Sequence, residues 1–103
     1  MNASEIAMEL LSKCPSLKNY EAYMFGSYLN GIGVDIDVLI VGISHDRFAA
    51  VKSELALCSR ELPLDVIFME PDEANETNFV IDAGCVPFEK LTTNRAKIFN
   101  YRK

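Results

Sequence analysis

The sequence predicts a small α/β (α+β) protein in which one mixed β-sheet is flanked by helices. Apolar segments rich in β-branched and aromatic residues alternate with amphipathic stretches of helical period, as in a sheet covered by helices. Only the eight residues 26–33 join the first two apolar segments. This is too few for a parallel crossover, so we expect the sheet to be mixed. At 103 residues, half of them hydrophobic, the chain predicts a single domain over residues 1–103.

Three helical regions are expected. Residues 4–13 place apolar side chains at a spacing of four and end before a proline. Residues 44–62 carry an apolar stripe of the same period, with Ser44 available as N-cap. A last helical region is expected from Pro71 to about Asp82, and Gly84 is a suitable stop.

Four segments are typical of strands. The aromatic-rich Tyr20–Phe25 is the first, and Val34–Val41, which is β-branched and bounded by glycines, is the clearest. Pro63–Glu70 is the third. Residues 85–91 are expected to form a short edge strand, because Pro87 cannot donate to the centre of a sheet.

Composition restricts the classes of partner. The net charge of −5 argues against tight, nonspecific binding of nucleic acid, which needs a basic face. The basic residues near the C-terminus are interpreted as a solvated terminus, with contact to RNA or a protein as the alternative. The N-terminus lacks the basic and apolar regions of a signal peptide, and no apolar run approaches the ~20 residues of a membrane span. A cytoplasmic protein without a membrane partner is therefore expected.

The cysteines and the single histidine do not indicate a metal centre. Cys14, Cys58 and Cys85 lack CxxC spacing and are odd in number, so we expect buried free thiols rather than a disulfide framework or zinc site. His45 has no second histidine or nearby cysteine to share a ligand. It is interpreted as part of a helix cap.

Two aspartates interrupt the second strand. Because side chains alternate along a strand, Asp35 and Asp37 are expected on one face, with α-carbons roughly 6–7 Å apart. Two carboxylates this close repel each other, and a hard divalent cation such as Mg²⁺ relieves the conflict. Carboxylates at this spacing can converge on a pair of metal ions ~3.5–4 Å apart. The alternative is that both acids are solvated at the start of the strand as turn residues.

Two further features lie around this pair. Gly26 and Ser27 follow the first strand at the start of a loop, where glycine lets the backbone approach a phosphate and serine adds a hydroxyl; a plain hairpin turn is the alternative. Asp65 lies inside the apolar third strand, where a carboxylate is costly unless partnered. It could join the other two as metal ligand and general base, or bond a backbone amide at the strand start.

Together these residues resemble a known signature. Phe25-Gly26-Ser27, seven intervening residues and Asp35-Ile36-Asp37-Val38 resemble the motif of the DNA polymerase beta-like nucleotidyltransferase superfamily. The following helix and the strand that carries Asp65 also resemble this family. The chain length is most similar to the minimal nucleotidyltransferases, which are single-domain members. The resemblance implies the nucleotidyltransferase fold.

The resemblance also implies a chemistry. Asp35, Asp37 and Asp65 would bind two Mg²⁺ ions, and Gly26 and Ser27 would hold the β- and γ-phosphates of ATP or another nucleoside triphosphate. Asp65 would help deprotonate an acceptor hydroxyl on a protein or RNA, which attacks the α-phosphorus and expels pyrophosphate. The group transferred would be a nucleoside monophosphate, AMP in the case of ATP.

Two departures from the family leave alternatives open. Residues 28–34 contain no arginine or lysine, and the helical domain of larger members is absent from the sequence. The resemblance therefore implies help from a partner, which in the minimal group is often a HEPN-domain protein in a toxin–antitoxin pair. The alternative is a catalytically degenerate fold that binds such a partner, and an antibiotic-modifying transferase is a third class. No segment decides between a homo-oligomer and a hetero-complex, with Tyr23, Tyr28 and Tyr101 as candidate exposed contacts.

Overall fold

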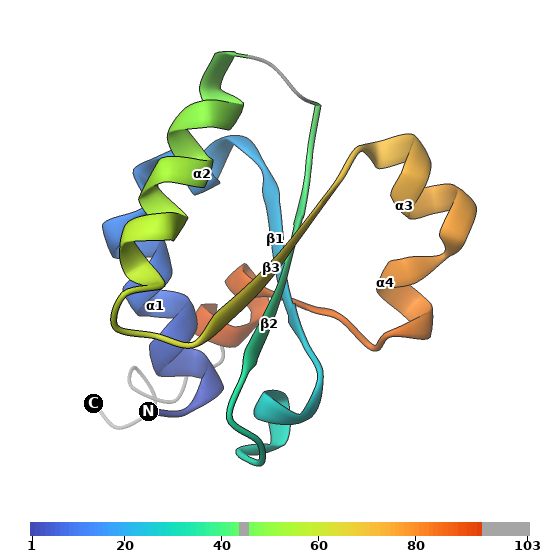
Figure 1. Ribbon diagram of the computed structural model, residues 1–103. Coiled ribbons are helices and arrows are strands. Elements are labelled where there is room, and N and C mark those ends of the chain that lie inside the picture. The colour runs from blue at the N-terminus through green and yellow to red at the C-terminus, as the bar shows by residue number, and fades with distance from the viewer. Residues whose placement is uncertain (44–45, 94–103) are drawn as a thin grey trace.

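The computed structural model describes residues 1–43 and 46–93, without the side chains of residues 46 and 47 (Figure 1). Its helices are α1 (Ala3–Lys13), α2 (Asp46–Cys58), α3 (Pro71–Thr77) and α4 (Phe79–Asp82), with the short 3₁₀ helices η1 (Pro15–Asn19) and η2 (Ser27–Asn30). Its strands are β1 (Glu21–Phe25), β2 (Ile36–Val41), β3 (Leu64–Met69) and β4 (Val86–Pro87). Residues 88–93 are also helical.

The strands form one sheet in the order β3-β2-β1-β4. β1 runs antiparallel to β2 and β4, whereas β2 and β3 are parallel and are connected through α2. The helices α1 and α2 lie on one side of the sheet, and α3 and α4 lie on the other (Figure 1). The expected mixed sheet flanked by helices is confirmed.

The central strand β2 is buried on both faces. Ile36, Val38 and Ile40 belong to the larger core, which α1, α2 and Phe88 complete. The alternate residues Leu39 and Val41 form a smaller core with α3 and α4. Because the side chains alternate, the two aspartates predicted for this strand are directed away from the larger core.

The start of β2 differs from the prediction. The strand begins at Ile36 rather than Val34, so Asp35 lies immediately before the strand. Gly33 adopts a φ of +102°, and Val34 is 79% exposed, which shows that the chain is still turning there. Backbone pairing begins where the Ile36 amide donates to the Pro63 carbonyl at 2.9 Å.

The first two helices also differ at their ends. α1 begins at Ala3 because Asn2 and Glu5 form a reciprocal capping box, with bonds of 2.8 and 2.9 Å. α2 ends at Cys58 instead of reaching Leu62. The next residues form tighter turns, and the Ser59 hydroxyl bonds back to a carbonyl of the last helical turn. The proposed cap Ser44 lies outside the described residues.

The C-terminal third departs most from the prediction. The expected helix from Pro71 to Asp82 is two helices, because Asn78 adopts the left-handed conformation with a φ of +53°. Gly84 has a φ of +66° just after α4, which confirms it as a stop. The edge strand is confirmed only for Val86–Pro87, and residues 88–93 are helical instead.

Several smaller predictions are also resolved. Cys14 and Cys58 are buried and free as expected, but Cys85 is only half-buried. Tyr23 and Tyr28 are half-buried rather than exposed, and their hydroxyls donate to Glu21 and to the Met1 carbonyl. His45, Tyr101 and the basic tail lie outside the described residues. Within residues 1–43 and 46–93, no helix is long and apolar enough to cross a membrane.

Candidate active site

One row of side chains crosses three strands at one end of the sheet. Phe25 of β1 is the register partner of Asp37 in β2, and Asp37 is the register partner of Asp65 in β3. Register partners on adjacent strands direct their side chains to the same face. The next row on that face, Tyr23, Leu39 and Ile67, is apolar and belongs to the smaller core. The acids therefore lie at the edge of an apolar layer.

Asp37 is the most sequestered acid of this group. It is half-buried, whereas Asp35 and Asp65 are exposed. Burial raises the pKa of Asp37 above its ordinary value, and the negative charges of Asp65 and Asp35 raise it further. The ionised form of Asp37 is thus disfavoured unless a cation is present.

Gly26 brings the backbone against Asp37. It has a φ of +82°, and an added Cβ would overlap Oδ2 of Asp37 and lie 3.2 Å from its Cγ. This is a position where only glycine fits, on both conformational and steric grounds. The end of β1 and the carboxylate of Asp37 in β2 therefore meet without an intervening side chain.

A second glycine closes the loop that follows. Gly33 has a φ of +102°, and an added Cβ would overlap Oγ of Ser27. The Ile32 amide also donates to the Ser27 carbonyl at 3.3 Å. Ser27 is consequently held between the end of β1 and the start of β2, exposed and next to the acid row. The sequence indicates Gly33 only as a strand boundary, because its contact with Ser27 depends on how the loop folds back.

The chemistry of the acids fits a magnesium site. Their oxygens are the hard ligands that Mg²⁺ prefers, and their mutual repulsion is what a cation relieves. As the side chains stand, no group of three or more His, Cys, Asp or Glu within the described part of the chain is arranged to hold a metal ion. The register brings Asp37 and Asp65 together, whereas Asp35 acts on Asp37 through its charge from just outside the strand.

Aromatic contacts support the row from the side of the smaller core. Phe79 of α4 packs edge-on against Phe25, with ring centroids 5.3 Å apart and planes at 90°. Phe79 falls within the helical region expected from the sequence, but its place beside the acid row follows from the register of Phe25 with Asp37. The pair fixes the end of β1, and with it Gly26.

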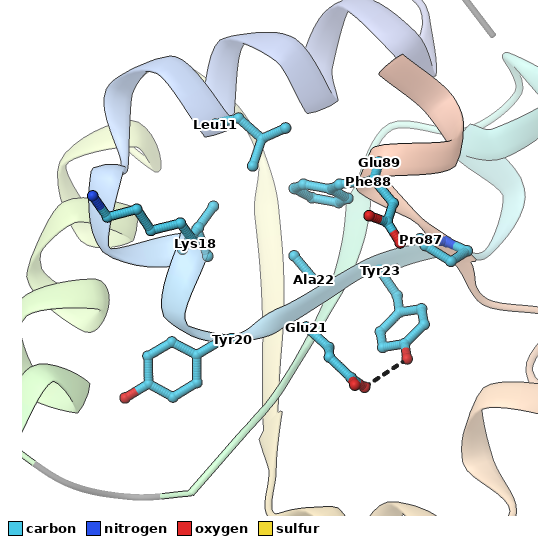
Figure 2. Close-up of a pocket in the computed structure, with 10 residues that line it drawn as sticks. Leu11, Lys18, Tyr20, Glu21, Ala22, Tyr23, Pro87, Phe88 and Glu89 are labelled. Atoms are coloured by element: carbon cyan, nitrogen blue, oxygen red, sulfur yellow. Dashed lines mark hydrogen bonds between the residues drawn. The ribbon is translucent and has the colours of Figure 1, made fainter. Parts of the chain in front are cut away.

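The hollow drawn in Figure 2 is separate from this row. It has a volume of about 330 Å³ and lies between α1, β1 and the Pro87–Glu89 segment (Figure 2). Within it, the Tyr23 hydroxyl donates to Glu21 at 2.8 Å, and burial together with this bond raises the pKa of Tyr23 to about 12. None of Gly26, Ser27 and the three site aspartates lines it.

A mixed sheet with a Gly-Ser turn facing an Asp-x-Asp strand and a third acid on the adjacent strand is the arrangement implied by the sequence motif. The model of the nucleotidyltransferase domain family matches residues 4–99, and the chain belongs to this family. The match includes every residue of the candidate site. No curated protein and no solved structure matches the chain.

Proposed function

We propose that this protein transfers a nucleoside monophosphate, AMP from ATP, to a hydroxyl group of a protein or RNA in a Mg²⁺-dependent reaction. The observation that carries the proposal is the row in which Asp37 and Asp65 are register partners, with Gly26 directly against Asp37. Family membership supports nucleotidyl transfer in general. The metal, the nucleotide and the acceptor are the parts that we add.

The chain would contribute mainly positioning and charge. Asp35, Asp37 and Asp65 would hold two Mg²⁺ ions, which supply the charge neutralisation that a polyphosphate needs. Gly26 lets the backbone at the end of β1 pass directly against the Asp37 carboxylate, so its main chain would lie beside the phosphates, and Ser27 would offer an exposed hydroxyl to the β- and γ-phosphates. In phosphoryl transfer such positioning and electrostatic stabilisation account for most of the catalysis.

Asp65 would accept the proton of the acceptor hydroxyl. It is exposed at the edge of the row, so an incoming protein or RNA can reach it, whereas Asp37 is half-buried against Gly26. The freed oxygen would attack the α-phosphorus, and pyrophosphate would leave towards Gly26 and Ser27. Each proposed role thus follows from exposure and from position in the row.

The first test is calorimetric titration of ATP into the purified chain, with and without Mg²⁺. We expect binding that requires Mg²⁺ and that Asp37→Asn abolishes. Asp72→Asn is the matched control, because Asp72 is an exposed acid in the first turn of α3, beyond the opposite end of β3 from Asp65. Binding that survives Asp37→Asn, or that Asp72→Asn removes equally, would contradict the assigned site.

One observation favours a second function, a protein-binding module. Ile32 and Val34 flank Gly33 beside the acid row, and they are 69% and 79% exposed. The loop carries these aliphatic side chains where basic residues would meet a triphosphate. An antitoxin-like role towards a HEPN-type partner, or self-association, would use this surface. Neutralisation of such a partner that withstands Asp37→Asn but not Ile32→Ser with Val34→Ser would support this second function.

A further inference from the structure

Two cysteine sulfurs meet inside the larger core, on the sheet face opposite the acid row. Cys14 caps the C-terminus of α1, and Cys58 is the last residue of α2. Their Sγ atoms are 3.6 Å apart, and both cysteines are free thiols. A disulfide has an S–S distance of about 2.05 Å, so the sulfurs need to approach by only about 1.5 Å.

One of the two thiols can be reached from solvent. Cys58 is 8% exposed and lines a cavity of about 270 Å³, together with Lys13 of α1 and several residues of α2 and the turn after it. Cys14 is fully buried and does not line this cavity. We therefore expect a small oxidant to meet Cys58 before Cys14, whose sulfur lies 3.6 Å from that of Cys58.

We propose that Cys14 and Cys58 form a redox-active dithiol, which a hydroperoxide closes to a disulfide in the folded protein. The Cys58 thiolate attacks the peroxide, takes one oxygen to become a sulfenic acid, and releases water or an alcohol. The Cys14 thiolate then attacks the Cys58 sulfur and expels hydroxide, which leaves as water after taking a proton. In the net reaction two thiols lose two electrons and two protons, and the peroxide is reduced.

The second step is expected to be the slower one. Burial, followed by the contact with Cys58, raises the pKa of Cys14 to about 12. Only the thiolate attacks, so ring closure should accelerate as pH rises towards that value. The sulfenic acid on Cys58 should consequently accumulate at neutral pH and be consumed faster in alkaline buffer.

The disulfide would cross-link the C-terminal ends of α1 and α2, which cover the sheet face opposite the acid row. The loop that it closes, residues 14–58, contains β1, η2, β2 and α2, and with them Gly26 and Asp37. Cross-links that close loops of this length stabilise mainly by restricting the unfolded chain, and we expect Tm to rise by roughly 10–20 °C. This inference does not depend on the proposed function.

Peptide mapping without reductant tests the proposal. The full chain is treated with a small excess of hydrogen peroxide at neutral and alkaline pH, before and after addition of dithiothreitol. We expect a Cys14–Cys58 linked peptide, a mass loss of two hydrogens, and a Tm increase that dithiothreitol reverses. Cys85→Ser should behave identically, because Cys85 is half-buried and belongs to the smaller core.

Two results would overturn the proposal. One is oxygen addition to Cys58 without any linked peptide, and the other is cross-linking only through Cys85. Cys14→Ser should leave a sulfenic acid on Cys58 that dimedone traps, which separates the first step from the second. Because this substitution places a hydroxyl in the core and can impair folding, the maps of the unmodified chain and of Cys85→Ser decide the outcome.

Discussion

The fit between Gly26 and Asp37 can be tested by adding a single methyl group. In Gly26→Ala, the new residue must adopt a φ of +82° and ψ of −170°, a region essentially restricted to glycine. That conformation costs about 1–3 kcal/mol. The methyl also overlaps Oδ2 of Asp37, and overpacking of this kind costs about 1–3 kcal/mol. We therefore expect the free energy of unfolding to fall by about 4 kcal/mol, a large share of the stability of a small domain.

Gly31→Ala is the matched control for this prediction. Gly31 has a similar φ of +75°, but nothing lies within 4 Å of an added Cβ. The control should therefore lose only the conformational part, about 1–2 kcal/mol. Urea unfolding of both variants measures the difference, provided that the m-values agree.

A double-mutant cycle separates strain from overlap. When Asp37 is first replaced by alanine, Gly26→Ala should cost about 2 kcal/mol less than in the unmodified chain, because the overlapping carboxylate is gone. Equal losses for Gly26→Ala and Gly31→Ala, or an unchanged cost in the Asp37→Ala background, would refute the close approach of Gly26 to Asp37.

Three further predictions concern charge and capping. The pKa of Asp37 is raised above 3.8 in the folded protein, so protonation of Asp37 favours the folded state, and the free energy of unfolding falls as pH rises through the folded pKa. Asp37→Asn should therefore raise Tm at pH 7. This gain in Tm should vanish in thermal scans below about pH 3.8, where Asp37 is protonated in both states. Asp65→Asn should lower the pKa of Asp37 in a carboxyl NMR titration, and an unchanged pKa would show that Asp65 is remote. Asn2→Ala should lower the free energy of unfolding by about 1 kcal/mol through loss of the capping box, whereas Ser12→Ala on the exposed side of α1 should not.

Much of the fold could be predicted because the hydrophobic pattern determines it. The alternation along β2 assigns Ile36, Val38 and Ile40 to one core and the odd-numbered residues to the other face, where Asp37 lies. The short link between β1 and β2 likewise required an antiparallel pair. These are properties of a single segment or of its length, and a sequence displays them directly.

The sequence-based predictions were wrong where local backbone geometry or packing between distant segments determines the secondary structure. Asn78 divides the predicted C-terminal helix by adopting a positive φ, although asparagine also occurs within helices. Phe88 is only 2% exposed in the larger core, and the residues that follow it are helical rather than extended. No periodicity in so short a segment indicated that outcome.

The candidate site was predictable in its residues but not in its geometry. Glycine, serine and three acids are visible as a motif, but the alignment of Asp65 with Asp37 depends on the register of β3 against β2. The contact between Gly33 and Ser27 depends on the loop folding back on itself. The position of Asp35 just before β2 was likewise set by the turn at Gly33.

Paramagnetic broadening by Mn²⁺ with ATP locates the bound ion directly and needs no knowledge of the acceptor. We expect the amide resonances of Gly26, Asp37 and Asp65 to broaden first as Mn²⁺ and ATP are added. The far ends of the same strands should broaden later, and excess Mg²⁺ should reverse the effect. Broadening that begins instead at the acidic start of α3, or that ignores ATP, would contradict the assignment of the acid row as a metal–nucleotide site.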